Sequence, residues 1–244
     1  MLRKVHELKD YDILATDGKI GHVHSFYFDE ATWTIRYMVI DTGGWLSERR
    51  VLISPSALET PVWETKEFPV NLTRDQITNS PKIDTDEPIT RDHETALHRH
   101  YEWPLYWADT LDEDNRTFVA GPGGAVAPTA PRERVSYIRS TEEVSGYHIE
   151  ATDGEIGHVE DFFVDDSSWE IHYLEIDTRN WLPGKKVLIA PKWVTSFDWE
   201  GEDVHVNMTR QQVKDSPEYE APKPLDRAYE TRLYDYYGLP YYWL

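Results

Sequence analysis

The sequence contains no cysteine and no long hydrophobic run. Without cysteine, the chain can form no disulfide, thiolate nucleophile, iron–sulfur cluster or cysteine-ligated zinc site. The longest apolar runs, such as residues 38–40, are far shorter than the roughly 20 residues that a membrane-spanning helix needs. The first residues are too polar for a secretory signal peptide. We therefore expect a soluble, cytoplasmic protein with no integral membrane segment.

Positive charge is scarce as well. The chain has 25 Lys and Arg against 45 Asp and Glu, a formal net charge of −20. Proteins that bind nucleic acid or anionic lipid headgroups need a basic surface, so we expect neither kind of partner. The chain is nevertheless not disordered by composition, because 39% hydrophobic residues and ten Trp are enough for a packed core.

The common catalytic motifs are also missing. The sequence has no Gly-Lys-Ser/Thr phosphate loop, no Gly-x-Ser-x-Gly elbow and no His-Glu-x-x-His helix. Asp41 and Asp177 each precede a threonine at the end of a predicted strand, where a carboxylate typically accepts backbone N–H bonds in a turn. We therefore expect no enzyme, no catalytic residue and no cofactor.

An internal repeat organises what is present. Residues 15–23 return as 151–159, and the offset of 136 holds without a gap until Trp107 meets Trp243. About 40 of these 93 positions are identical, far above chance. Two copies of about 105 residues are too few for a solenoid and are each the size of a domain. We predict two homologous domains, called here the first copy (1–107) and the second copy (135–244).

Charge and histidines differ between the copies. The first copy has a net charge of −6 and the second −12, so their surfaces differ. His93, His98 and His100 share one predicted helix, and such a group can ligate a metal. Because tyrosines stand at all three positions of the second copy, we favour packing or surface roles and expect no metal site.

Within each copy, turn signals separate short alternating segments. The Asp17-Gly18 pair lies between apolar runs, as in a β-hairpin. Alternating residues over 22–28 and 33–40 predict two strands, and 49–53 a third. Thr73 is placed to cap a helix over 74–78. Five or six short antiparallel strands with close turns imply a small barrel, and three-to-four spacing of apolar residues predicts a helix in each tail.

These residues resemble the PRC-barrel domain. The similarity rests on the Asp-Gly-x-Ile-Gly-x-Val run of 17–23, the Trp-x-Ile-x-Tyr-x-Val-Ile-Asp-Thr run of 33–42, and the run from Gly44 to Pro55. The resemblance implies a six-stranded β-barrel like those of the photosynthetic reaction centre H subunit and the ribosome maturation factor RimM. It also implies a non-enzymatic module that binds other proteins. The chain lacks the H subunit's membrane helix and RimM's N-terminal domain, so neither photosynthesis nor ribosome assembly carries over.

The predicted fold is mainly β. It consists of two small antiparallel PRC-type β-barrels, each followed by a short C-terminal helix, joined by a Gly/Pro-rich linker. The predicted boundaries are barrel 1 at 1–80, tail helix and aromatic cluster 1 at 81–107, the linker at 108–134, barrel 2 at 135–217, and tail helix and aromatic cluster 2 at 218–244. We expect pseudo-two-fold packing, with each tail helix against the sister barrel.

Apolar side chains on loops and termini are the candidates for contacts between barrels or chains, since such residues often anchor interfaces. They are Trp45, Trp181, Tyr106, Trp107, Tyr242, Trp243, Leu97 and Leu233. Turn residues expected to hold the fold are Asp17, Gly18, Gly21, Asp153, Gly154 and Gly157. The pairs Trp33/Trp169 and Trp63/Trp199 are interpreted as core packing.

Three functions are compatible with these features. The favoured one is a non-catalytic interaction or assembly module with a protein partner, and further self-association into a homo-oligomer is consistent with it. The alternative is a sensor that binds a small ligand or metal in a pocket between the two barrels. The third, an enzyme, would need a cleft with perturbed carboxylates.

Overall fold

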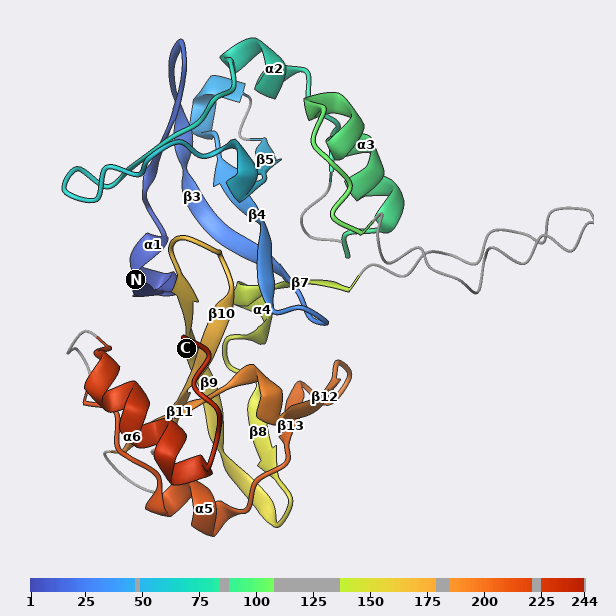
Figure 1. Cartoon of the computed structure of the whole chain (residues 1–244). Coiled ribbons are helices and arrows are strands. Elements are labelled where there is room, and N and C mark those ends of the chain that lie inside the picture. Colours follow the sequence, from blue (N-terminus) through green and yellow to red (C-terminus); the bar gives the residue numbers. More distant parts are fainter. Residues whose placement is uncertain (47–48, 84–87, 108–136, 179–184, 221–224, 244) are drawn as a thin grey trace, which may run out of the picture.

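The structure is a computed structural model and describes residues 1–46, 49–83, 88–107, 137–178, 185–220 and 225–243. The fold is mainly β and contains two sheets, one built largely from each copy (Figure 1). The predicted linker lies outside the described residues.

The first copy has short strands around one long one. Its elements are β1 (Leu2–Lys4), α1 (Val5–Leu8), β2 (Asp12–Ala15), β3 (Gly18–Asp29), β4 (Thr34–Asp41), the 3₁₀ helix η1 (Gly43–Leu46), β5 (Arg50–Ile53), η2 (Pro55–Ala57), β6 (Glu67–Pro69), α2 (Arg74–Thr78) and α3 (Arg91–Tyr101). The sheet order is β5-β4-β3-β2-β6. The predicted helix over 74–78 is confirmed, and Thr73 caps it in a capping box with Gln76.

The second copy repeats this order. Its elements are β7 (Ile138–Ser140), α4 (Thr141–Val144), β8 (His148–Ala151), β9 (Gly154–Asp165), β10 (Ile171–Asp177), β11 (Lys186–Ile189), η4 (Pro191–Trp193), β12 (Val194–Asp198), β13 (Asp203–Val206), α5 (Arg210–Asp215) and α6 (Arg227–Tyr237). The sheet order is β11-β10-β9-β8-β13-β12, so β12 is an additional strand relative to the sheet of the first copy.

The prediction of purely antiparallel sheets is wrong. β2 pairs with β6, and β8 with β13, in parallel register, while the other strand pairs are antiparallel. The long connection through β3, β4 and β5 brings β6 back beside β2 in the same direction. Within the described ranges, the strand pairing does not close either sheet into a barrel.

The two copies exchange their N-terminal strands. β1 pairs with β9 of the second copy, and β7 pairs with the end of β3 of the first copy (Figure 1). Leu2 lies opposite Asp165, and Ile138 lies opposite Asp29. The two pairs correspond, because Ile138 is the counterpart of Leu2 and Asp29 that of Asp165 at the offset of 136. Such reciprocal contacts are what a two-fold arrangement of like units produces.

The tail helices pack against their own copies, so the expectation of contact with the sister barrel is wrong. In α3, Glu94 accepts a hydrogen bond from Tyr37 on β4. In α6, Glu230 accepts one from Tyr173 on β10. Figure 1 accordingly places α3 beside the sheet of the first copy and α6 beside that of the second. The exchanged strands therefore make the reciprocal contacts that the tail helices were expected to make.

Glycine is required where β3 and β9 pass the end of the neighbouring strand. A Cβ on Gly21 would lie 2.0 Å from the backbone oxygen of Asp41, and one on Gly157 would lie 2.0 Å from that of Asp177. Gly157 also has a φ of +137°. The predicted structural role of these glycines thus corresponds to a close backbone approach.

The hairpins before them are fixed by their aspartates. Asp17 Oδ1 accepts a hydrogen bond from the backbone N–H of Arg74, and Asp153 Oδ1 from that of Arg210. Gly18 and Gly154 follow with φ of +140° and +128°, a region that side chains disfavour. The same contact thus ties each first hairpin to the start of α2 or α5.

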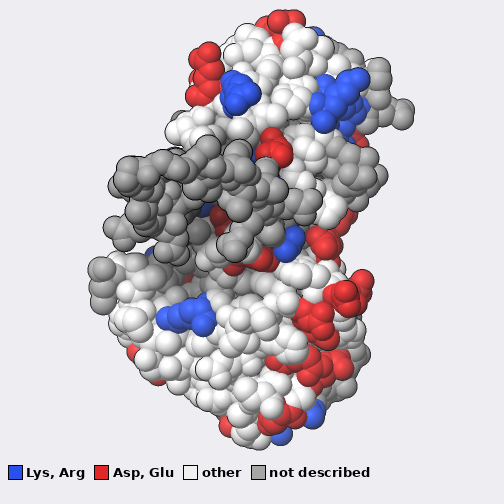
Figure 2. Space-filling view, turned by 90° about the vertical axis from the view of Figure 1, so that its right-hand side faces the viewer, with Lys and Arg blue, Asp and Glu red and all other residues white. Residues whose placement is uncertain are grey.

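Surface charge is uneven. Figure 2 shows Asp and Glu side chains gathered along one side of the lower half of the molecule, which is the second copy. The upper half carries fewer of them in this view. This distribution agrees with the larger negative charge of the second copy.

Candidate binding clefts between the two copies

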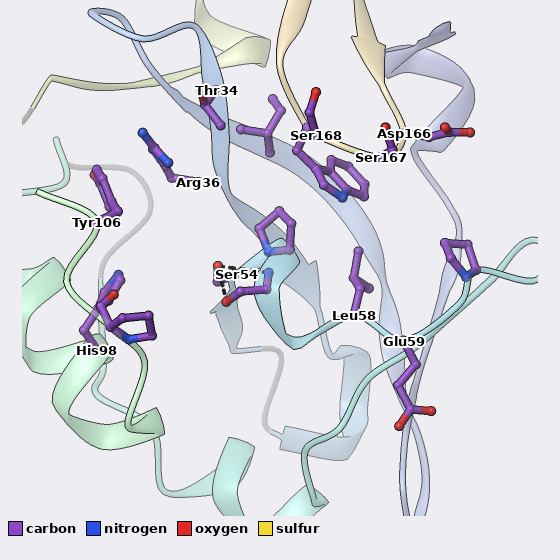
Figure 3. Close-up of a pocket in the computed structure, with 16 residues that line it drawn as sticks. Thr34, Arg36, Ser54, Leu58, Glu59, His98, Tyr106, Asp166, Ser167 and Ser168 are labelled. Atoms are coloured by element: carbon purple, nitrogen blue, oxygen red, sulfur yellow. Dashed lines mark hydrogen bonds between the residues drawn. The ribbon is translucent and has the colours of Figure 1, made fainter. Parts of the chain in front are cut away.

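Two related clefts lie where the copies meet. The first cleft has a volume of about 460 Å³, within the range of roughly 300–1,000 Å³ that is usual for ligand sites. The first copy contributes the start of β4, η2 and the tail after α3, and the second copy contributes the turn between β9 and β10. In Figure 3, Arg36, His98 and Tyr106 lie on one side and Asp166 and Ser168 on the other.

The second cleft is the counterpart of the first. Its volume is about 620 Å³, also within the ligand-site range. Every residue of its lining corresponds, at an offset of 136, to a residue that lines the first cleft, and only Glu59, Pro61 and Pro104 of the first cleft have no counterpart. Corresponding pairs that line the clefts are Thr34 and Glu170, Arg36 and His172, Ser56 and Lys192, His98 and Tyr234, and Tyr106 and Tyr242.

Between the clefts, the β3–β4 and β9–β10 turns meet. Ile35 donates its N–H to the carbonyl of Trp169 (2.8 Å), and Ile171 donates to the carbonyl of Trp33 (2.7 Å). Trp33 and Trp169 have φ of 54° and 61°, unusual for aromatic residues. Across the junction, Trp33 packs on Phe197, and Trp169 packs on Phe26 and Phe68. Trp33 also stacks on Phe28 of its own copy. These two tryptophans, interpreted from sequence as core residues, therefore join the copies.

A buried carboxylate lies behind the first cleft. Glu94 is fully buried and accepts hydrogen bonds from the hydroxyls of Tyr37 and Tyr106. Arg91 forms an ion pair with it at 2.8 Å. Burial and the nearby carboxylate raise the pKa of Tyr106 and of Tyr37, so both phenols stay protonated donors. The network holds the tail residue Tyr106 against β4.

The second cleft has the same network. Glu230, 3% exposed, accepts hydrogen bonds from Tyr173 (2.9 Å) and Tyr242 (2.7 Å) and pairs with Arg227 at 3.0 Å. The Arg227 side chain is 54% exposed, whereas Arg91 is 11% exposed. The second network is therefore more open to water.

The polar groups of the two clefts differ. In the first, the Arg36 guanidinium lies 3.9 Å from the centre of the Tyr106 ring and 3.7 Å from Asp29. In the second, His172 stacks on Tyr242, and the ammonium of Lys192 lies 5.1 Å from the Tyr234 ring. One architecture thus presents two chemically different surfaces.

The cleft histidines are neutral. His98 is buried between Tyr37 and the carbonyl of Pro104, and desolvation lowers its pKa despite hydrogen bonds that favour its charged form. Desolvation also lowers the pKa of His172, against the pull of nearby carboxylates such as Glu170. Neither imidazole supplies a positive charge near neutral pH.

Within the described ranges, no group of three or more His, Asp or Glu residues is placed to hold a metal ion. His93 and His98 turn to different partners. His93 Nδ1 lies 3.4 Å from the backbone N–H of Thr90 as part of a cap, and His98 faces the tail. His100 Nε2 faces the carbonyl of Gln76. The predicted helix carries these histidines, but they do not converge.

The predicted interface residues have different surroundings. Trp107 is 5% exposed and packs on His98, Tyr106 and Arg91 of its own copy. Trp243 packs on Tyr234 and Arg227 in the same way. Leu97 and Leu233 are buried in the cores. Tyr106 and Tyr242 line the clefts, and Tyr242 is 40% exposed.

Two predicted interface residues are not described in full. Trp45 lies in η1 and its side chain is outside the described part, as is all of Trp181. Contacts of these eight residues with a partner or a second chain stay a prediction.

The arginines of the exchanged strands stack on tryptophans of their own copies. The Arg3 guanidinium, on β1, lies 3.4 Å from the centre of the Trp63 ring, and Arg139, on β7, lies 4.1 Å from that of Trp199. Each arginine also pairs with a carboxylate of the other copy, Arg3 with Asp166 and Arg139 with Glu30. Arginines at both exchanged strands therefore bridge the copies.

Sequence analysis did not identify the Glu94 and Glu230 networks. A signal was available, because Tyr37, Arg91, Glu94 and Tyr106 all recur unchanged in the second copy. An Arg-x-x-Glu pair on a helix usually forms a weak exposed contact, and nothing local indicates that its glutamate is buried.

Comparison with known families supports the fold assignment. Residues 2–66 match the family model of the PRC-barrel domain. This range runs from β1 to the start of β6 and confirms the predicted resemblance for the first copy. No curated protein matches the chain. No helix in the described part of the chain is long and apolar enough to cross a membrane.

Proposed function

Because residues 2–66 are a PRC-barrel domain, a type often found in protein interactions, we propose that this chain is a non-catalytic interaction module. Its binding sites are the two clefts between the copies. The observation that carries the proposal is that each cleft is lined by both copies, so that a partner is bound only by the assembled pair.

The fold proposal belongs with it. Each copy is a PRC-type barrel whose wall is completed by the N-terminal strand of the sister copy. Support comes from the match over the first copy, the repeat, and the pairing of β1 with β9 and of β7 with β3. The arrangement makes the pair of copies the functional unit.

The partner is a basic segment of another protein. A net charge of −20 attracts cationic chains and repels acidic ones. Exposed carboxylates, Glu59 at the first cleft and Glu170 at the second, stand among the lining residues. Aromatic rings beside them, Trp169, Trp33 and Tyr242, suit the stems and cationic heads of Lys and Arg.

The proposal assigns no catalysis to these clefts. Glu94 and Glu230 are buried carboxylates bonded to residues that line them, and tyrosine and arginine donors occupy both carboxylates. A general acid or base must reach a reacting group, and these carboxylates lie behind the tail residues.

The test uses substitutions that fill one cleft at a time. Ser56→Trp fills the first cleft and Lys192→Trp the second, since these positions correspond. Calorimetric titration with peptides selected from a Lys/Arg-rich library measures the stoichiometry. We expect two sites in the parent chain, one in each single variant and none in the double variant.

Glu64→Trp is the control, because Glu64 is exposed and lines neither cleft. It is expected to keep both sites. Unchanged stoichiometry in the double variant, or equal binding of a Glu-rich library, would contradict the proposal.

A small-ligand sensor is the second candidate, favoured by cleft volumes that suit small molecules. Native mass spectrometry of the chain purified from its host distinguishes the two. A stoichiometric small-molecule adduct that Ser56→Trp or Lys192→Trp removes would support the sensor, and the bare chain mass would count against it.

A further inference from the structure

The two strand-exchange junctions have the same backbone and different side chains. At the second-copy junction, β1 lies on β9 and Lys4 is opposite Phe163. At the first-copy junction, β7 lies on β3 and Ser140 is opposite Tyr27. Lys4 and Ser140 occupy the same position, 136 residues apart.

The second-copy junction buries a group of charges. The Lys4 ammonium lies 2.5 Å from Glu175 Oε2, and Glu175 is 0% exposed. Lys186 approaches Glu175 Oε1 at 2.9 Å, and Asp161, 7% exposed, accepts a hydrogen bond from the backbone N–H of His6 on the exchanged segment. The rings of Phe163 and Tyr219 lie 5.5 and 5.3 Å from the Lys4 ammonium.

At the first-copy junction, three of the four corresponding positions are uncharged, and Arg50 stands where Lys186 does. Val39 stands where Glu175 does, Ser25 where Asp161 does, and Ser140 where Lys4 does. The smaller side chains leave a cavity of about 320 Å³, larger than a lysine stem requires. The space that Lys4 fills in one junction is therefore open in the other.

These differences decide which strands fit which sheet. If two second copies from different chains exchanged strands, Ser140 would face Glu175, and the buried carboxylate would keep only Lys186. If two first copies did so, the Lys4 ammonium would enter the cavity beside Val39 and Ser25. A buried charge that loses its partner is strongly destabilising.

We propose that the Lys4–Glu175 ion pair makes the strand exchange heterotypic: the sheet of a second copy accepts the N-terminal strand of a first copy and rejects that of another second copy. The surface is the β9–β10 end of the second copy, and its partner is the β1 segment of a first copy. A first copy paired with the second copy of its own chain meets this rule, and dimers that exchange strands between like copies are excluded. This inference is independent of what the clefts bind.

The first test is a double-mutant cycle in the full chain. Glu175→Val and Lys4→Ser introduce the residues found at the other junction, so the double variant has a precedent in the same molecule. We expect Glu175→Val to raise the unfolding equilibrium constant by about a hundredfold or more, because it leaves a buried ammonium beside valine. The double variant is expected to recover most of the stability that Glu175→Val loses. Ser140→Asn at the first-copy junction is the control; asparagine can still cap α4, so this variant stays close to the parent.

The second test measures exchange. The chain is unfolded in urea and refolded over a range of concentrations, and its mass is followed by light scattering. The parent is expected at 28.6 kDa. The double variant Lys4→Ser/Glu175→Val has no Lys–Glu pair at either junction, so the fraction of dimer should rise on the order of tenfold. The variant Val39→Glu/Ser140→Lys makes both junctions charged and should have the same effect.

Lys4→Met with Glu175→Gln keeps the shapes of both side chains and serves if the valine variant does not fold. Its dimer fraction should also exceed that of the parent. The proposal is overturned if Glu175→Val is as stable as the parent, or if the folded neutral double variants refold to the same dimer fraction as the parent.

Discussion

The junction on the sheet of the first copy contains Ser140, Val39 and Ser25, whereas the junction on the sheet of the second copy has Lys4, Glu175 and Asp161 at the same positions. The backbone pairing is the same at both. The positions that determine the backbone, such as Gly21 and its counterpart Gly157, are unchanged between copies. Duplication has therefore kept the residues that hold the chain path and altered those that face the junction and the clefts.

The largest expected loss of stability comes from substituting the glycine that both copies share. Gly21→Ala and Gly157→Ala each put a Cβ 2.0 Å from a backbone oxygen that belongs to a neighbouring strand. Each should lower the free energy of unfolding by about 4 kcal/mol or more, and Gly157→Ala more than Gly21→Ala because its φ is +137°. Urea unfolding measures this. Gly44→Ala, with no atom within 4 Å of its Cβ, is the control and should be near neutral.

The next comparison concerns the buried carboxylates. Glu94→Gln should cost about 3 kcal/mol of unfolding free energy and Glu230→Gln less, since Arg227 is far more exposed than Arg91. Thermal unfolding of both variants shows which of the two loses more stability. Asp92→Asn, exposed on the same helix, should change stability little. Equal losses at the two positions would show that water exposure of the arginine does not matter.

The stability of the second copy should depend on pH in a way that the first copy does not share, because Ser25 stands where Asp161 does. Burial raises the pKa of Asp161 to about 6, with a further rise from Glu175 and opposing effects of backbone donors and Lys4. A raised folded-state pKa means that the protonated form favours folding, so this contribution is full below about pH 4 and is lost as pH rises through 6. Asp161→Asn should remove up to about 3 kcal/mol of that dependence. Urea midpoints from pH 4 to 7 check this, and a variant with the same slope as the parent would refute it.

The smallest effect concerns the arginines that bridge the copies. Arg3→Ala and Arg139→Ala should each cost about 1 kcal/mol, with Arg3 the larger because its guanidinium lies closer to its tryptophan. Chemical unfolding in low and high salt measures both. A loss that disappears in high salt would assign it to the carboxylates rather than to the rings.

Local signals in the sequence were sufficient for local structure. Asp17-Gly18 predicted the β2–β3 hairpin and Thr73 a capped helix, because each feature depends on residues close in the chain or on a conformation particular to glycine. The parallel pairing of β2 with β6 was not predictable in this way, since the pairing joins residues about 55 apart and β6 has only three residues.

Contacts between the copies were hidden for a similar reason. β1 has only three residues, and nothing in Leu2–Lys4 indicates that its partner is 160 residues away. Trp63 packs on Tyr11 and Phe68 of its own copy, as the sequence indicated, but nothing in the sequence shows that Arg3 stacks on it. Alignment of the two copies locates shared positions but does not reveal which copy each side chain faces.

The strand exchange also determines when each copy can complete its fold during synthesis. The sheet of the first copy receives β7, so it lacks one strand until residue 140 has left the ribosome. β1, the first strand to be made, has no partner until β9 is complete at Asp165. Domains of a growing chain generally fold one after another. Here the N-terminal segment must wait for more than half of the chain, and the two copies reach their final form together.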